Sequence, residues 1–128
     1  MTLVVRCMMP VMDYKELRVW QRSIDLVSAI YTATRTFPEE EKYGLKSQLR
    51  RAAVSVPSNI AEGQGRSTTG EFQHFLGIAR GSLYEIETQI HIADRLSLLQ
   101  PDQMDEIKAN WKEVIRMLNS LMRALPRK

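Results

Sequence analysis

Apolar residues recur along most of the chain at alternating steps of three and four, the spacing of amphipathic α-helices. Four such segments are separated by prolines, glycines and short polar stretches. They predict helices at about 14–36, 38–62, 68–96 and 101–125. Four helices with short connections predict an all-α fold, an antiparallel up-down-up-down four-helix bundle. We place this bundle at residues 13–128, after an N-terminal arm (residues 1–12) that has no periodicity.

The first predicted helix carries two apolar stripes. The Trp20 stripe consists of Leu17, Trp20, Ile24, Val27 and Tyr31. The Leu26 stripe, roughly 120° round the same cylinder, consists of Val19, Leu26, Ile30, Ala33 and Phe37. Together they cover about half the circumference, more than the apolar face of roughly 100° that a surface helix needs. Either one stripe contacts a partner chain, or the helix lies deep between two neighbours of its own chain.

Pro57 interrupts the second predicted helix, since proline lacks a backbone N–H and clashes with the carbonyl four residues back. We therefore predict a kink between Ala53 and Pro57. Gly63 and Gly65 end this helix. The Gly63-Gln64-Gly65 loop is not a phosphate-binding loop, because it follows a helix and lacks the Gly-Lys-Ser/Thr sequence.

Local signals also mark the last two predicted helices. Thr68 and Glu71 have the spacing of a capping box at the start of the third helix. Gly77 and Gly81 lie four residues apart inside that helix, each at a cost of about 1 kcal/mol relative to alanine. We take this cost to indicate another helix crossing close by. Pro101 is suited to the first position of the fourth helix.

Positive charge is concentrated in one part of the chain. The whole sequence has a net charge of +3, whereas residues 42–66 hold five bases and one acid, a net charge of +4. Lys42, Lys46 and Arg50 follow each other at four-residue steps on one predicted helix face, with Arg51 beside them. Like charges at this spacing repel each other, and a nucleic-acid backbone is the commonest partner that would offset the repulsion.

The candidate nucleic-acid-binding residues are therefore Lys42, Lys46, Arg50, Arg51 and Arg66. The alternative is a solvated face, or one paired with acids of the third and fourth helices: Glu85, Glu87, Asp94 and Glu113. No base-reading motif accompanies these cations, so sequence-specific recognition is not predicted.

Catalysis, metal binding and cofactor binding are not predicted. Polar residues near inward positions (Asn59, Glu62, Arg80, Ser82 and Glu85) include no nucleophile with a positioned acid–base pair. We expect them to form a hydrogen-bonded network that ties the kink to the third helix. His74 and His91 stand seventeen residues apart on one helix, roughly 25 Å, and match no metal-ligand spacing.

The remaining composition favours a cytoplasmic protein without a membrane segment. Cys7 is the single cysteine, so no internal disulfide can form. No apolar run approaches the roughly 18 residues that a membrane span requires.

The motifs ELRVWQRS, FPEEEKYGLKSQLRRAAVSVPSNIAEGQGR and FLGIARGSLYEIETQI resemble the bacterial proteins encoded in intervening sequences of 23S ribosomal RNA genes. The resemblance runs from about Tyr14 to Leu125. It implies a four-helix bundle that assembles into a homopentameric ring, and no established activity. The family is similar to the accessory proteins of diversity-generating retroelements, basic pentameric barrels that associate with nucleic acid and a reverse transcriptase.

The motif positions that the resemblance carries over are Arg50, Arg51, Asn59, Glu62, Gly81, Ser82 and Glu85. We expect structural roles for them, with the two arginines also contacting phosphates. The sequence therefore predicts a non-enzymatic, oligomeric helical bundle that binds RNA or DNA weakly through the backbone, with no small-molecule substrate. The alternative is an adaptor or scaffold ring that binds another protein and has no role in nucleic-acid binding.

Overall fold

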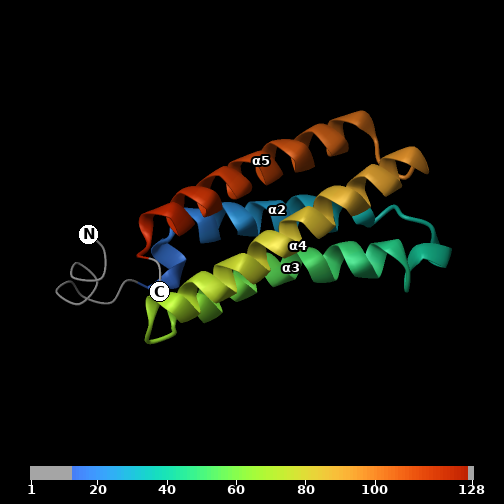
Figure 1. Ribbon diagram of the computed structural model, residues 1–128. Coiled ribbons are helices and arrows are strands. Elements are labelled where there is room, and N and C mark those ends of the chain that lie inside the picture. Colours follow the sequence, from blue (N-terminus) through green and yellow to red (C-terminus); the bar gives the residue numbers. More distant parts are fainter. Residues whose placement is uncertain (1–12, 127–128) are drawn as a thin grey trace.

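The computed structural model describes residues 13–126, which form four α-helices and no strand (Figure 1). The helices are α2 (Arg18–Thr34), α3 (Leu45–Gln64), α4 (Thr69–Arg95) and α5 (Pro101–Ala124). Two 3-10 helices precede α2 and α3, namely η1 (Tyr14–Glu16) and η2 (Glu39–Glu41). The all-α prediction is confirmed. The predicted arm at residues 1–12, with Cys7, lies outside the described residues.

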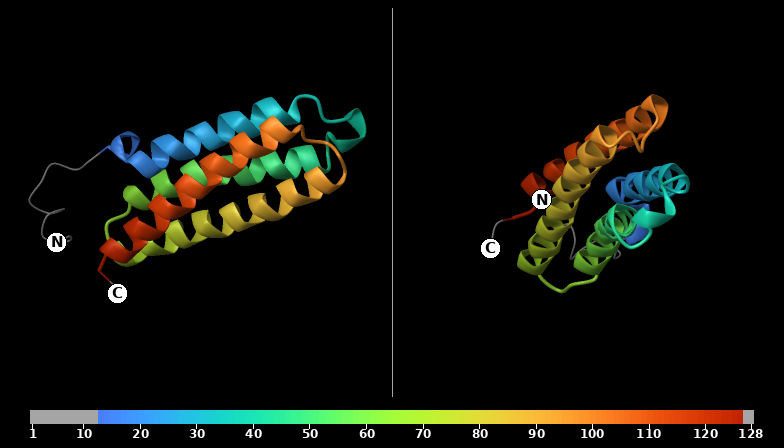
Figure 2. Two further views of the ribbon diagram at one scale, coloured as in Figure 1. Left: turned by 90° about the horizontal axis from the view of Figure 1, so that it is seen from above. Right: turned by 90° about the vertical axis from the view of Figure 1, so that its right-hand side faces the viewer.

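Each helix packs mainly on two others. α2 contacts α3 and α5, and α4 contacts the same two helices, with the most extensive contact between α3 and α4. The helices lie side by side, and the connections that join them lie alternately at the two ends (Figures 1 and 2). The segment with η2 and the α3–α4 turn therefore lie at opposite ends of α3.

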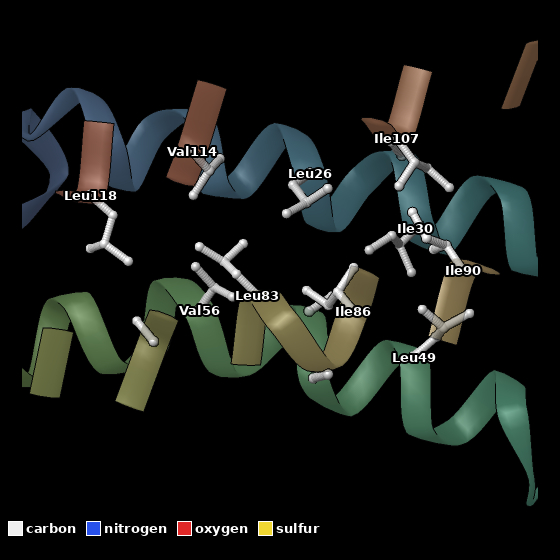
Figure 3. Packing of buried hydrophobic residues seen from close by; sticks show 14 of the residues in the cluster. Leu26, Ile30, Leu49, Val56, Leu83, Ile86, Ile90, Ile107, Val114 and Leu118 are labelled. Carbon is white, nitrogen blue, oxygen red and sulfur yellow. The ribbon is translucent and has the colours of Figure 1, made fainter. Parts of the chain in front are cut away.

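The core is built from one apolar face of each helix (Figure 3). The Leu26 stripe of α2 is buried, and Leu26 and Ile30 have no exposed surface. The Trp20 stripe lies at the edge of the core: Leu17, Trp20 and Val27 are partly buried, whereas Ile24 and Tyr31 are 37% and 36% exposed. One chain therefore covers one stripe fully and the other in part.

Side chains set the starts of the last two helices. The Thr68 side chain accepts a hydrogen bond from the backbone N–H of Glu71 at 3.1 Å, which is one of the two bonds of the predicted capping box. Pro101 is the first residue of α5, as predicted. A capping box between Gln100 and Gln103 completes that start, and sequence reasoning missed it because both partners are glutamines rather than a Ser/Thr–Glu pair.

The predicted start of the second helix, at about residue 38, is wrong. Residues 39–41 form only the 3-10 helix η2, and α3 begins at Leu45. The carboxylate of Glu41 accepts a hydrogen bond from the backbone N–H of Leu45 at 2.9 Å, so the α-helix has its first donor satisfied at that point. The carboxylate reaches this N–H through the space beside Gly44, where a β-carbon would lie 2.9 Å from the Glu41 oxygen. Lys42 consequently lies outside α3.

The α-helix α3 continues through Pro57, which is buried. The predicted kink between Ala53 and Pro57 stays a prediction.

The expectation of a close helix crossing at Gly77 and Gly81 is also wrong. A β-carbon built on either glycine would meet nothing within 4 Å. The close approach is at Gly63 instead, where a β-carbon would lie 2.9 Å from both Phe72 Cδ1 and Phe75 Cβ. Because only residues 65–68 join α3 to α4, the two helices are held together beside this turn. Gly77 and Gly81 of α4 face open space instead.

Candidate nucleic-acid interface

Four of the five predicted cations surround one hollow in the protein surface. The hollow has a volume of about 470 Å³ and is lined by Tyr31, Lys42, Lys46, Ser47, Arg50, Arg51 and Val54. We call it the basic hollow. Its walls come from the last turns of α2, the connection after η2 and the first half of α3. Although Lys42 is not on the helix, the turn before α3 still brings it beside Lys46.

Arg50 has a structural role in the basic hollow. Its Nε donates to Thr34 Oγ1 at 2.8 Å, and its Nη2 donates to the Tyr31 carbonyl oxygen at 3.1 Å. The guanidinium also lies 4.2 Å from the centroid of the Tyr31 ring. These three contacts join α3 to the end of α2, so Arg50 fixes the wall of the hollow as well as adding charge to it.

Lys46 and Arg51 supply charge without such contacts. Within residues 13–126, neither side chain has a hydrogen bond or ion pair. Lys42 is exposed, with its Nζ 5.5 Å from the centroid of the Tyr43 ring. The basic hollow therefore holds four positive side chains, and none of them is paired with a carboxylate of the described residues.

The acids of α4 and α5 do not neutralise the basic hollow. Within the described part of the chain, the ion pairs are Arg66–Glu62 at 2.8 Å and Arg116–Glu113 at 2.7 Å. The hydrogen bond and charge of Arg116 lower the pKa of Glu113, and the charges of Arg22 and Arg18 act in the same direction. Glu113 therefore pairs with Arg116 of its own helix. Of the two alternatives for the cations, pairing with acids of the last two helices is not found among residues 13–126, whereas a solvated face is not tested.

Arg66 lies away from the basic hollow. It stands sixteen residues after Arg50, beyond the far end of α3, roughly 24 Å along the axis. Its guanidinium pairs with Glu62 and lies 4.8 Å from the centroid of the Phe75 ring. The structure therefore places Arg66 at the α3–α4 turn rather than with the other four cations.

The predicted polar network contains only some of its expected members. Ser55 Oγ and Ser82 Oγ are 2.8 Å apart, which links α3 to α4 beside Pro57. The Asn59 amide donates to Ser55 Oγ at 2.9 Å and to the Ser55 carbonyl at 2.8 Å. Sequence reasoning singled out Asn59 and Ser82 but did not place Ser55 between them.

The other three predicted members lie elsewhere. Arg80 donates to Asn119 Oδ1 on α5 at 3.0 Å, and Glu62 pairs with Arg66. Glu85 is exposed, and no contact joins it to the network. Three residues correspond to about 300° of helical rotation, so Glu85 lies roughly 60° round the helix from Ser82 and on the exposed side of it.

Neither a metal centre nor a membrane span is found in residues 13–126. No three His, Cys, Asp or Glu side chains in this part of the chain gather closely enough to hold a metal ion. None of its helices combines the length and apolar character needed to cross a membrane.

The family model of the 23S rRNA-intervening sequence protein matches residues 15–120. The chain belongs to this family. The match spans most of the chain and confirms the resemblance carried by its motifs. No match was found among curated proteins.

A solved structure shares the fold of this intervening-sequence protein. It is a protein of unknown function from the S23 ribosomal protein family of Bacteroides thetaiotaomicron, and the two chains are 20% identical. The alignment covers 88% of this chain and 99% of that chain, with a TM-score of 0.75. At this identity the similarity shows a common four-helix arrangement and carries no functional residue across.

Proposed function

We propose that this intervening-sequence protein is a non-enzymatic, oligomeric bundle that binds RNA or DNA through the sugar-phosphate backbone at the basic hollow. The observation that carries the proposal is the gathering of Lys42, Lys46, Arg50 and Arg51 without a neutralising carboxylate among the described residues. Binding a phosphate backbone releases condensed counterions from the nucleic acid, and this release favours association.

Backbone recognition suits the way the cations are presented. α3 packs on α2 and α4, so the cations on its free face lie on the side of the bundle. A recognition helix that enters the major groove must instead project from its domain. Contacts to phosphates position a protein on nucleic acid without reading its sequence. The proposed binding is therefore weak for one copy and independent of sequence.

Assembly of several copies would multiply this weak contact. The partly exposed Trp20 stripe of α2, with Ile24 at its open edge, supports a contact between copies. The family resemblance implies a homopentameric ring. Closed symmetry places one basic hollow per copy around the assembly, and simultaneous contacts raise the overall affinity well above that of one site.

Charge reversal in the basic hollow is expected to weaken nucleic-acid binding. In the Lys46→Glu/Arg51→Glu variant, affinity should fall for every sequence, and the slope of log affinity against log salt should lose about one per phosphate contact removed. Fluorescence anisotropy with labelled oligonucleotides between about 50 and 200 mM salt measures both quantities. Arg50 stays native, because replacing it would also break its contacts with Thr34 and Tyr31.

The matched control is Lys108→Glu/Lys112→Glu, which makes the same change of net charge on exposed positions of α5. This helix packs mainly on α2 and α4 rather than on α3. The control should keep most of the affinity. Equal losses in both variants, or binding that does not respond to salt, would contradict the proposed site.

A charge in the Trp20 stripe is expected to disrupt assembly. Ile24→Lys places an ammonium group at the open edge of the stripe, where docking of a second copy would have to bury it. Light scattering after nuclease treatment should show the native protein as an oligomer and this variant as a single chain. Ile92→Lys, at a 45% exposed position of α4, is the control that should remain assembled.

A native protein that scatters as one chain would contradict the oligomeric part of the proposal. Co-purification of a stoichiometric protein partner that resists nuclease, without nucleic-acid binding, would favour the adaptor function instead.

A further inference from the structure

Tyr43 is the most exposed large hydrophobic residue of the described chain. Its side chain is 87% exposed, well above the 56% of Leu96, which ranks next. An aromatic ring in this position removes almost no apolar surface from water within its own chain. Tyr43 therefore contributes little to the stability of the bundle, and its ring is free to contact a ligand.

The ring lies at the rim of the basic hollow. Tyr43 directly follows Lys42, which lines the hollow, and Lys42 Nζ lies 5.5 Å from the ring centroid. The next turn of chain carries Lys46, another lining residue. An exposed aromatic face and unpaired cations thus occur together within a few residues.

A second aromatic ring lies inside the hollow. Tyr31 lines it and remains 36% exposed while the Arg50 guanidinium stacks on its ring at 4.2 Å. The bonds from Arg50 to Thr34 and to the Tyr31 carbonyl hold the guanidinium in place. The hollow therefore has a wall made by Arg50 and Tyr31, in addition to the exposed ring of Tyr43.

Aromatic faces beside cations are what unpaired nucleotides require. The bases of a single strand expose their faces and stack on aromatic side chains, while the cations contact the phosphates between them. In a duplex each base is covered by its neighbours in the stack, so an aromatic ring at the protein surface gains little from it. Phosphate contacts alone would favour the duplex, because it releases more counterions per contacted phosphate than a single strand does.

We infer that the basic hollow selects single-stranded over double-stranded nucleic acid, with a base stacked on Tyr43 and the adjoining phosphates bound by Lys46 and Arg51. This inference rests on the proposed function and specifies the substrate class of the same site. It applies to RNA and DNA alike, because both expose the same base faces when unpaired.

The test compares three ligands with matched tyrosine variants by fluorescence anisotropy. These three ligands are a deoxythymidine oligonucleotide, an abasic strand with the same phosphates, and a DNA duplex. A fourth ligand, a uridine oligonucleotide, extends the test to RNA. Tyr43→Leu should weaken binding of the thymidine strand by about fivefold or more and should leave duplex binding within about twofold. Tyr43→Phe keeps the ring and should keep the affinity.

Two comparisons isolate the stacking contribution. The native protein should bind the abasic strand about as weakly as Tyr43→Leu binds the thymidine strand. The first complex lacks the base and the second lacks the aromatic ring, so neither can form the stack. Tyr84→Leu, at a 50% exposed tyrosine whose ring contacts Trp111 on α5, should bind the thymidine strand like the native protein. Thermal melting of each variant checks that the fold is retained.

The outcomes separate this inference from the proposed function. If Tyr43→Leu binds the thymidine strand like the native protein while Lys46→Glu/Arg51→Glu does not bind it, backbone binding stands and the stacking inference is overturned. Equal losses of single-strand and duplex binding in Tyr43→Leu would also overturn it. A native protein that binds none of these ligands contradicts both proposals.

Discussion

Phe72→Ala should lower the free energy of unfolding by about 3–5 kcal/mol. Phe72 lies in the first turn of α4, is 2% exposed and is among the largest fully buried side chains of the described core. Truncation removes the ring from the α3–α4 contact and leaves a cavity that surrounding helices fill only in part. Because a domain of this size is stable by about 5–15 kcal/mol, the loss is a large fraction of the total. Urea denaturation followed by circular dichroism measures it.

His91→Ala is the control for Phe72→Ala. His91 is an exposed residue of the same helix, and its replacement should change the free energy of unfolding by less than about 0.5 kcal/mol. If Phe72→Ala costs no more than this control, the first turn of α4 is not packed as described.

Alanine at two glycines should change stability in opposite directions. Gly63→Ala should lower the free energy of unfolding by about 1–3 kcal/mol, because its β-carbon would lie 2.9 Å from Phe72 Cδ1 and Phe75 Cβ and force the two helices apart. Gly81→Ala should raise it by about 0.5–1 kcal/mol, since its β-carbon meets nothing within 4 Å and alanine restricts the unfolded chain.

The same denaturation experiment measures both glycine variants, and each serves as the control for the other. The sign of the change is the critical result, because helix propensity alone would make both variants more stable. A loss of stability in Gly81→Ala would indicate that something packs against α4 at this level in solution. A gain in Gly63→Ala would contradict the close approach beside the α3–α4 turn.

The helical period explains why the fold was predictable. Apolar residues at steps of three and four mark one face of a helix whatever the helix packs against, so the Leu26 stripe, which the structure buries, was identified from the sequence. Thr68 and Pro101 mark helix starts because capping depends on a few neighbouring residues. The start of α3 was misjudged because residues 39–41 form a 3-10 helix, and the Glu41 side chain accepts from the backbone N–H of Leu45, where α3 begins.

The candidate site was predictable in part for the same reason. Lys46 and Arg50 share a face of α3 through helical spacing alone. The stacking of Arg50 on Tyr31 joins residues nineteen positions apart, and no local pattern predicts such a contact. Arg66 was grouped with the other cations because it lies in the same positively charged stretch of sequence. In the structure the length of α3 separates it from them.

The sequence by itself determined the helices, their buried faces and the concentration of positive charge, because each depends on residues within a turn or two of one another. Only the tertiary structure decided which glycine is crowded, which cations share a hollow, and that Tyr43 is left exposed beside them. Those outcomes depend on how helices distant in the chain approach each other. That approach is set by the packing of all four apolar faces together, and no single segment of the sequence contains it.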